Sequence, residues 1–322
     1  MNNKKNLISK EDTIFIAGHK GMVGKSIENE LRSKGYTRII TISKKELDLS
    51  IFSEVENFFK KHKPNIVILA AAKVGGIAAN NKYPTEFLLD NLKIQNNVIE
   101  SAWKNNTRRL LFLGSSCIYP KFAVQPINEE QLLSNSLEST NKSYAIAKIC
   151  GLQLCSSLRK QYKFDAISLM PTNLYGQGDN YHSENSHVLP ALIRRFHEAK
   201  ENGLSEVCIW GTGNPRRELL HTDDLANALL FLLKLENPPH WVNIGTGKDH
   251  TILEIANLIK EIIGFRGKIT HDLSKPDGMT VKRLDVGLMD SLGWKSSTEL
   301  TTGIKETYED FLLNLKVGTA RL

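Results

Sequence analysis

The chain carries a tyrosine and a lysine that together could move a proton. Tyr144 and Lys148 are four residues apart, so on a helix they lie on one face. A phenol ordinarily loses its proton near pH ~10, and a neighbouring ammonium favours the phenolate. Lys148 is therefore expected to lower the pKa of Tyr144 towards neutrality. Taken alone, such a pair more often marks two surface residues on an ordinary helix.

Two features upstream change that interpretation. Ser115 follows an apolar run at 110–113, and the chain begins with a turn whose glycines are Gly18, Gly21 and Gly24. In this order the three features predict a nucleotide-cofactor site with a phenol as its proton donor. That site limits the chemistry to a few carbonyl reactions.

The glycine turn lies between an expected strand at 13–17 and a helix expected from about Val23. Glycine permits the tight turn, the close approach of backbone to a pyrophosphate and the packing of helix on strand. The helix N-terminus adds free N–H groups and a favourable dipole. The spacing is GxxGxxG and not GxGxxG, yet its place between strand and helix predicts dinucleotide binding.

The residues after the second expected strand indicate which cofactor is used. An NAD enzyme usually has an acid there for the ribose 2′-hydroxyl. Here the strand leads into Ser43 and Lys44, with Lys20 available from the glycine turn. Such cations favour the 2′-phosphate of NADP. Asp48 is then expected at the adenine amino group, while the competing Glu46 is better placed to open a helix or face solvent.

The order of apolar and amphipathic segments predicts an α/β fold. Buried strands are expected at 13–17, 38–42, 66–69, 110–113, 166–169 and 241–244. They alternate with helical patterns, one of them at 88–103, and a helix is expected from Asp223 or Asp224 to Leu235. This predicts a Rossmann-like doubly wound parallel sheet. Residues 1–175 and 221–248 are assigned to it, and 176–220 and 249–322 to a smaller mixed α/β substrate lobe.

Composition excludes several other classes of protein. The 322 residues are 41% hydrophobic with a net charge of +7, enough for a large core. No basic stripe with interleaved aromatics points to nucleic acid. The four cysteines lack CxxC spacing, so neither a disulfide framework nor a metal site is expected. Residues 1–12 lack the apolar centre of a signal peptide, and no apolar run is long enough for a bilayer. We expect a cytoplasmic protein without nucleic-acid or membrane partners.

Other candidate residues keep two interpretations each. Cys117 is either a small buried hydrophobe or, two residues after Ser115, a neighbour of Ser115 on the same side of a strand end. His187 is either structural or catalytic. His221 is expected to be structural, with Asp223 or Asp224 capping the next helix.

Two paired positions have the same ambiguity. The pair Arg216-Arg217 is either a solvated surface feature or a partner for a diphosphate. Gly75-Gly76, after the third expected strand, is expected to let the backbone pass close to a ligand.

The chain resembles the extended short-chain dehydrogenase/reductases. The resemblance spans about 13–294 and is carried by seven stretches, at 17–24, 70–77, 114–120, 171–176, 185–188, 220–224 and 274–278. Within that family it is most similar to the enzymes that epimerise GDP-4-keto-6-deoxy-D-mannose at C3 and C5 and reduce it at C4, giving GDP-L-fucose.

The resemblance implies roles for individual residues. Ser115, Tyr144 and Lys148 match the family's reductase triad, and Cys117 and His187 match its epimerisation base and acid. NADP(H) contacts are implied at Gly18, Lys20, Gly21, Met22, Val23, Gly24, Lys44, Asp48, Ala71, Lys148, Pro171, Asn173, Leu174 and His187. Substrate contacts are implied at Asn173, Arg195, Trp210, Arg217 and Asp277.

Two segments depart from the family pattern. Lys20 and Lys44 replace arginines, which keeps the charge but loses the bidentate fork. The family's Thr-Pro-Arg-Lys appears in shifted form at 279–283, so it stays open whether Lys282 or Arg283 meets the nucleotide.

Three functions stay open. The resemblance favours the NADPH-dependent epimerase-reductase, acting as a homodimer on a GDP-sugar. The first alternative is another nucleotide-sugar 4-epimerase or dehydratase, which regenerates its cofactor in each turnover. The second is a non-catalytic NADP-binding regulator, which has no need of Ser115, Tyr144 and Lys148.

Overall fold

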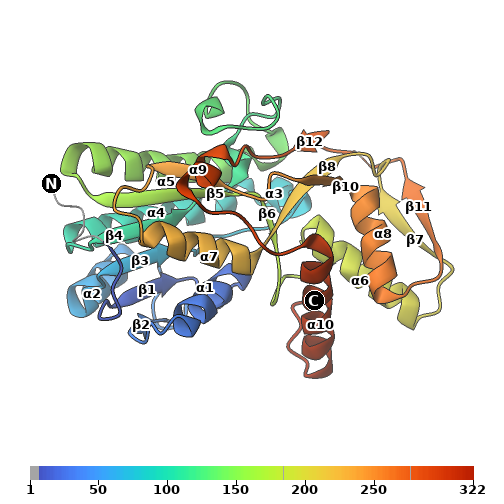
Figure 1. The fold of residues 1–322 in the computed structure, drawn as a ribbon, viewed down its shortest axis with the longest axis horizontal. Coiled ribbons are helices and arrows are strands. Elements are labelled where there is room, and N and C mark those ends of the chain that lie inside the picture. The colour runs from blue at the N-terminus through green and yellow to red at the C-terminus, as the bar shows by residue number, and fades with distance from the viewer. Residues whose placement is uncertain (1–6, 184, 276) are drawn as a thin grey trace.

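A parallel sheet is the largest feature of the computed structural model, which describes residues 7–183, 185–275 and 277–322. Within those residues the sheet has six strands in the order β2-β1-β3-β4-β5-β9 (Figure 1). Every neighbouring pair is parallel, which confirms the Rossmann-like doubly wound sheet. The strands are β1 (Ile14–Ala17), β2 (Ile39–Ile40), β3 (Ile66–Leu69), β4 (Arg109–Leu113), β5 (Asp165–Pro171) and β9 (Trp241–Ile244).

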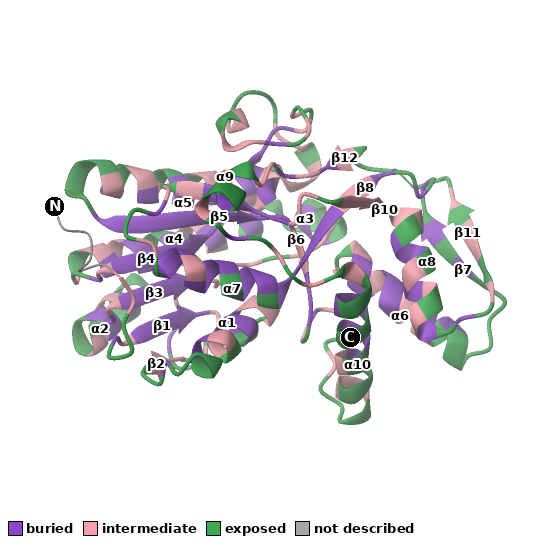
Figure 2. Ribbon diagram, viewed as in Figure 1, coloured by how far each residue is buried: buried purple, intermediate pink, exposed green. Residues whose placement is uncertain are grey.

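Helices cover both faces of this sheet, because alternate strand residues point to opposite sides. Ile14 and Ile16 of β1 belong to one core cluster, with α1 (Met22–Ser33) and α7 (Thr222–Leu233). Phe15 and Ala17 belong to the other, with α2 (Phe52–His62), α4 (Pro84–Lys104) and α5 (Lys142–Tyr162). Strands covered on both faces read as continuous apolar runs. Figure 2 accordingly shows β1, β3, β4 and β5 as buried.

A smaller region is built around β8 (Arg216–His221). This strand pairs antiparallel with β10 (Asp249–Thr251), and parallel with β12 (Val281–Lys282) and β6 (Asn173–Tyr175). A second pair joins β7 (Glu206–Trp210) to β11 (Lys268–Asp272). Phe196, Ile259 and Phe311 share a third core cluster with their helices, α6 (Val188–Glu201), α8 (Ile252–Ile263) and α10 (Leu300–Lys316). The mixed α/β tail expected from the sequence is therefore present.

One segment assigned to the substrate lobe packs elsewhere. In α9 (Gly287–Leu292) and just after it, Met289 and Trp294 join the core cluster that contains Ile14. These large apolar side chains are covered by the main sheet and its helices, so residues 287–294 belong with that sheet. The rest of the division into 1–175 with 221–248, and 176–220 with 249–322, stays a prediction.

The start of α7 differs from expectation. The helix begins at Thr222, and the side chain of His221 accepts a hydrogen bond from the Asp223 N–H at 3.4 Å. His221 is thus the N-cap, and the expectation that Asp223 or Asp224 caps this helix is wrong. The two carboxylates are engaged elsewhere, because Asp223 accepts from the Ser26 hydroxyl at 2.6 Å and Asp224 from the Ser297 N–H at 3.0 Å.

The carboxyl ends of the parallel strands gather the predicted site at one edge of the sheet. The strand order reverses between β1 and β3, which is where open α/β sheets bind their ligands. The glycine turn follows β1, Ala71 follows β3, Ser115 follows β4 and Asn173 follows β5. In the part of the chain that the structure describes, no helix is long and apolar enough to cross a membrane.

Candidate active site

The glycine turn brings β1, α1 and the end of β3 into close contact. Gly18 has a φ of +96°, and a Cβ there would lie 2.7 Å from the backbone nitrogen of Ala71. A Cβ on Gly24 would lie 2.2 Å from the Gly18 oxygen. α1 begins at Met22 with Gly21 as its N-cap, and no side chain caps it. Its first N–H groups are therefore available to an anionic ligand.

The cations expected near a 2′-phosphate lie on the surface beside this turn. Lys20 and Lys44 are both exposed. The Asp48 carboxylate accepts hydrogen bonds from the Ser50 N–H at 2.9 Å and hydroxyl at 2.7 Å, which lower the pKa of Asp48. Glu46 is exposed and accepts from the Ser43 hydroxyl at 2.5 Å, so it faces solvent as expected. The contact of Asp48 with adenine stays a prediction.

Ser115 is a neighbour of both Cys117 and Tyr144. Its hydroxyl oxygen accepts from the Cys117 N–H at 3.2 Å and caps a short 3₁₀ turn at Ser116–Ile118. The same hydroxyl lies close enough to Tyr144 to lower the pKa of that phenol. The strand ends at Leu113, so the expected i, i+2 strand geometry for Ser115 and Cys117 is wrong. The capped turn, not strand alternation, is what brings the two residues together.

Tyr144 and Lys148 share the face of α5 that covers the end of β4. The Tyr144 ring packs edge-on against Phe87, with ring centroids 6.3 Å apart. Lys148 is buried, and its ammonium donates to the Leu113 carbonyl at 2.7 Å. Its Nζ lies 5.8 Å from the centroid of the Tyr144 ring. The two side chains are therefore neighbours, as their spacing predicted.

The expected effect of Lys148 on the acidity of Tyr144 is wrong in this structure. Burial raises the pKa of Tyr144, the charge of Cys117 raises it further, and only the Ser115 hydrogen bond lowers it. Burial also lowers the pKa of Lys148 to about 7. Removal from water penalises both charged forms, and this outweighs the attraction between them. Tyr144 is consequently held as a protonated phenol, which is the form that can donate.

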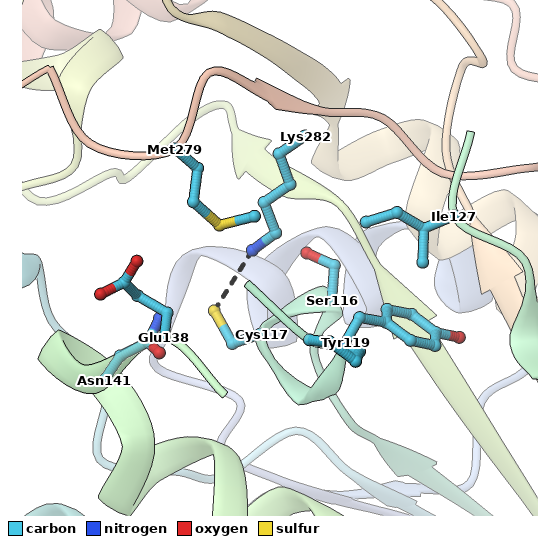
Figure 3. A pocket seen from close by; sticks show the side chains of 9 residues that line it. Ser116, Cys117, Tyr119, Ile127, Glu138, Asn141, Met279 and Lys282 are labelled. Atoms are coloured by element: carbon cyan, nitrogen blue, oxygen red, sulfur yellow. Dashed lines mark hydrogen bonds between the residues drawn. The ribbon is translucent and has the colours of Figure 1, made fainter. Parts of the chain in front are cut away.

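Cys117 has a cationic partner that the sequence did not identify. The Lys282 ammonium donates to the Cys117 sulfur at 3.5 Å, as Figure 3 shows. Lys282 comes from β12, and its segment was only a candidate for nucleotide contact. The two residues line one pocket, together with Ser116, Tyr119, Pro120, Ile127, Glu138, Asn141 and Met279.

His187 lies at the start of α6, where the charge of Lys282 affects its pKa. It is the N-cap residue of that helix, and it is exposed to solvent. Desolvation by the surrounding chain lowers the pKa of His187, and the Lys282 ammonium lowers it further. Lys282 is therefore hydrogen-bonded to Cys117, and its charge also lowers the pKa of His187.

The loop at Gly75-Gly76 has a different neighbour from the one expected. The Gly76 N–H donates to the Asn185 carbonyl at 3.2 Å. A Cβ on Gly76 would lie 2.7 Å from the Ser186 oxygen. The close approach seen here is to the chain's own backbone just before His187, and the expected approach to a ligand stays a prediction.

The predicted substrate residues form two clusters in the smaller region. The Arg195 guanidinium lies 5.2 Å from the ring centroid of Trp210, and the Lys275 ammonium lies 5.6 Å from it. Asp277 accepts from the Thr212 N–H at 2.7 Å and hydroxyl at 2.9 Å. Trp210 is exposed, which leaves an aromatic surface between two cations. Pro276, in the same predicted stretch, lies outside the described residues.

The second cluster connects the smaller region to the pocket of Cys117. Arg217 donates to the Met279 carbonyl at 2.6 Å, and Met279 lines the pocket. Asn173 donates to the Glu218 carbonyl at 2.9 Å. Pro171 ends β5, and Leu174 lies in β6 beside Asn173. These residues therefore lie between the carboxyl edge of the main sheet and the smaller region.

Glu218 is a structural residue that the sequence analysis missed. It is fully buried, and its carboxylate accepts from the N–H groups of Thr246 at 2.6 Å, Gly247 at 2.7 Å and Leu284 at 2.7 Å. Burial raises the pKa of Glu218, and these hydrogen bonds oppose the rise. An acid inside the apolar end of β8 was the available signal. Through Leu284 it holds the segment that carries Lys282.

No group of three or more His, Cys, Asp or Glu residues that could hold a metal ion occurs within the described ranges. The four cysteines are free.

Comparison with known proteins gives concordant matches along almost the whole chain. The NAD dependent epimerase/dehydratase family matches residues 14–245. GDP-L-fucose synthase 1 of Arabidopsis thaliana is 55% identical over 306 residues, 95% of each chain. GDP-L-fucose synthase of Escherichia coli K12 is 47% identical over 310 residues, 94% of this chain and 97% of its own. A solved GDP-L-fucose synthetase of Naegleria fowleri, bound to NADP, is 27% identical with a TM-score of 0.88 and 98% coverage of both chains.

Proposed function

The chain belongs to the NAD dependent epimerase/dehydratase family, and we propose that it converts GDP-4-keto-6-deoxy-D-mannose into GDP-L-fucose with NADPH. The Arabidopsis and Escherichia coli relatives carry the name of this activity. One observation supports it above the others. Ser115 accepts a hydrogen bond from the Cys117 N–H and also lowers the pKa of Tyr144, so the proposed base and proton donor share one neighbour.

The first stage is epimerisation at C3 and C5. The 4-keto group acidifies the neighbouring C–H bonds, because the electrons that remain spread onto the carbonyl oxygen. Cys117 removes the proton as a thiolate, and His187 returns one to the opposite face. Tyr144 donates a hydrogen bond to the enolate oxygen. The pKa of His187 is lowered, so its imidazolium, once formed, is a stronger acid than a free one.

The second stage is reduction at C4. When bound, NADPH supplies the hydride for this carbon. Tyr144, held protonated by burial, gives its proton to the C4 oxygen, and Ser115 orients the phenol. Lys148 lies beside the same ring and carries a pKa of about 7, so it is able to exchange a proton near neutrality.

The edge of the sheet fits the cofactor. The close packing of Gly18 on Ala71, and of Gly24 on Gly18, leaves no room for side chains between the turn and the strand ends. The start of α1 at Met22 and Val23 then offers free N–H groups to the pyrophosphate. Lys20 and Lys44 would meet the 2′-phosphate, and Asp48 the adenine. The Naegleria fowleri structure is that of an NADP complex, which supports the same choice.

The smaller region fits a nucleoside diphosphate. Trp210 offers an exposed ring for a base, and Arg195 and Arg217 supply guanidinium groups for the diphosphate. Asp277, beside Thr212, would take a hydrogen-bond donor of the base or ribose. Asn173 would contact the sugar near Tyr144.

Assembly and compartment form part of this proposal. We expect a homodimer through a surface that includes α5, and action in the cytoplasm. Size-exclusion chromatography with light scattering tests the first of these, and a mass equal to one chain would contradict it.

Incubation with GDP-4-keto-6-deoxy-D-mannose and NADPH tests the proposed function. The expected result is one NADPH oxidised per GDP-L-fucose formed, with the product identified by its NMR couplings. A 4-epimerase or dehydratase would give product without net oxidation, and a regulator would bind NADPH without turnover. Either result would contradict the proposal.

A further inference from the structure

Lys282 is an unusual lysine in its surroundings. Only 9% of its surface is exposed. It lies in β12, a two-residue strand paired with β8, where Lys282 is opposite Arg217. Within 7–183, 185–275 and 277–322, no carboxylate forms an ion pair with it. Its one hydrogen-bond partner in those ranges is the Cys117 sulfur, 165 residues away in the sequence. A buried ammonium normally has an anionic partner, and here the available group is a thiol.

The backbone that follows Lys282 is firmly held. The Leu284 N–H donates to the buried Glu218 carboxylate at 2.7 Å. The Arg283 N–H donates to the Gln125 side chain at 2.9 Å, and the Arg283 carbonyl accepts from the Ile127 N–H at 2.9 Å. Ile127 itself lines the pocket of Cys117. The ammonium is thus delivered to the sulfur by a rigid frame.

We propose that Lys282 keeps Cys117 in the thiolate form that removes the protons of C3 and C5. This inference rests on the proposed function, because it takes Cys117 as the epimerisation base. An ammonium at hydrogen-bond distance stabilises a thiolate relative to a thiol. Lys282 acts through Cys117, so it is a positioning residue with an electrostatic role.

The other charged groups near Cys117 have hydrogen-bond or ion-pair partners of their own, so Lys282 is the cation that acts on the sulfur. Lys148 is directed to the Leu113 carbonyl. Arg217 is directed to the Met279 carbonyl. The Glu138 carboxylate also lines the pocket, and it is paired with Lys121 at 3.2 Å. Tyr144 is held protonated. Figure 3 shows the ammonium pointing at the sulfur, with Met279 beside them.

The same charge acts on His187 in the complementary direction. Lys282 contributes to the lowered pKa of His187, so the imidazolium releases its proton more readily. In the forward step a C–H bond breaks, an S–H bond forms on Cys117, and the electron pair moves to the C4 oxygen. In the return step the His187 N–H bond breaks and a new C–H bond forms.

Alkylation of Cys117 tests the proposal without substrate or cofactor. The rate with iodoacetamide is followed by mass spectrometry of the Cys117 peptide across a pH series. K282M is expected to react about tenfold more slowly than the parent at neutral pH, and equally fast at alkaline pH. K282R should restore most of the rate. K305M, which removes an exposed cation on α10, should match the parent.

Equal neutral-pH rates in the parent and K282M would overturn the proposal. If K282M does not fold by circular dichroism, K282Q replaces it, because an amide of similar length fills the buried position. Since no sugar nucleotide is present, the result stands whether or not the chain makes GDP-L-fucose. A second arm measures deuterium uptake at C3 and C5. K282M should slow this uptake more than NADPH oxidation, and equal slowing would contradict the assignment.

Discussion

The site contains two buried lysines, and they are used in different ways. Lys148, on α5, donates to a backbone carbonyl at 2.7 Å and lies four residues from the tyrosine it accompanies. Lys282, on β12, donates to the sulfur of Cys117 across 165 residues of chain. Burial lowers the pKa of Lys148 to about 7. The Nζ of Lys282 lies 3.5 Å from the Cys117 sulfur.

This difference divides the site into two halves with different structural origins. The reductive half, with Ser115, Tyr144 and Lys148, is built within the main sheet and the helix that covers it. The epimerising half needs that sheet for Cys117 and the smaller region for Lys282 and His187. Changes in the smaller region should therefore affect epimerisation before they affect reduction.

Removal of the phenol should give the largest effect on the reductive half. Tyr144→Phe keeps the ring packed against Phe87 but loses the proton donor to the C4 oxygen. Reduction should fall by about 10²–10⁴-fold, the usual contribution of a general acid. NADPH binding, measured by fluorescence, should be unchanged. Turnover at the parent rate would show that Tyr144 does not donate this proton.

Removal of the thiol should disable the other half. Cys117→Ser replaces a thiolate by a hydroxyl, which is a far weaker base, so deuterium uptake at C3 and C5 should fall at least about 10²-fold. Hydride transfer should survive in part, giving slow NADPH oxidation and an unepimerised 6-deoxy sugar nucleotide. GDP-L-fucose formation at the parent rate would show that Cys117 is not the base.

His187→Gln should retain some deuterium exchange but impair inversion.

A smaller effect is expected at the cofactor end of the reductive half. Lys44→Asp places an acid where NADP has a phosphate, so kcat/KM for NADPH should fall by about tenfold or more while that for NADH changes little. The parent should prefer NADPH. Steady-state kinetics with both cofactors measure this, and equal kcat/KM values for the two in the parent would contradict it.

The last effect is on stability and not on activity, and it tests the buried state of Lys148. Its folded pKa is about 7, against an ordinary value of 10.5. Between these values the unfolded chain binds a proton that the folded chain does not, so parent stability rises with pH. Lys148→Met should therefore be more stable than the parent at pH 7, by up to roughly 5 kcal/mol. The gain should shrink as the pH rises towards 10, as measured by thermal unfolding. A pH-independent difference would contradict the lowered pKa.

Much of the reductive half could be predicted because its parts are local in the sequence. Continuous apolar runs located the strands of the main sheet, and the four-residue spacing placed Tyr144 and Lys148 on one face of α5. The predicted effect of Lys148 on the pKa of Tyr144 was wrong. Spacing in the sequence shows which charges are neighbours, but it does not show how deeply the two side chains are buried. The N-cap of α7 was also predicted wrongly, because the His221 side chain caps this helix in place of the acids that follow it.

The epimerising half could be predicted only in part. Cys117 and His187 were found by resemblance, but their link through Lys282 depends on a two-residue strand and on the hydrogen bonds of Glu218. Neither leaves a periodic pattern in the sequence. The glycine pair Gly75-Gly76 was recognisable in the sequence. It packs on the backbone of Asn185 and Ser186, about 110 residues further along the chain, and its spacing could not show that.

The central claim is that one pocket both exchanges protons at C3 and C5 and receives a hydride at C4. The most direct measurement is turnover of GDP-4-keto-6-deoxy-D-mannose with unlabelled NADPH in heavy water, followed by NMR of the product. We expect GDP-L-fucose with deuterium at C3 and C5, protium at C4, and one NADPH oxidised per product. Protium at C3 and C5, or deuterium at C4, would contradict it.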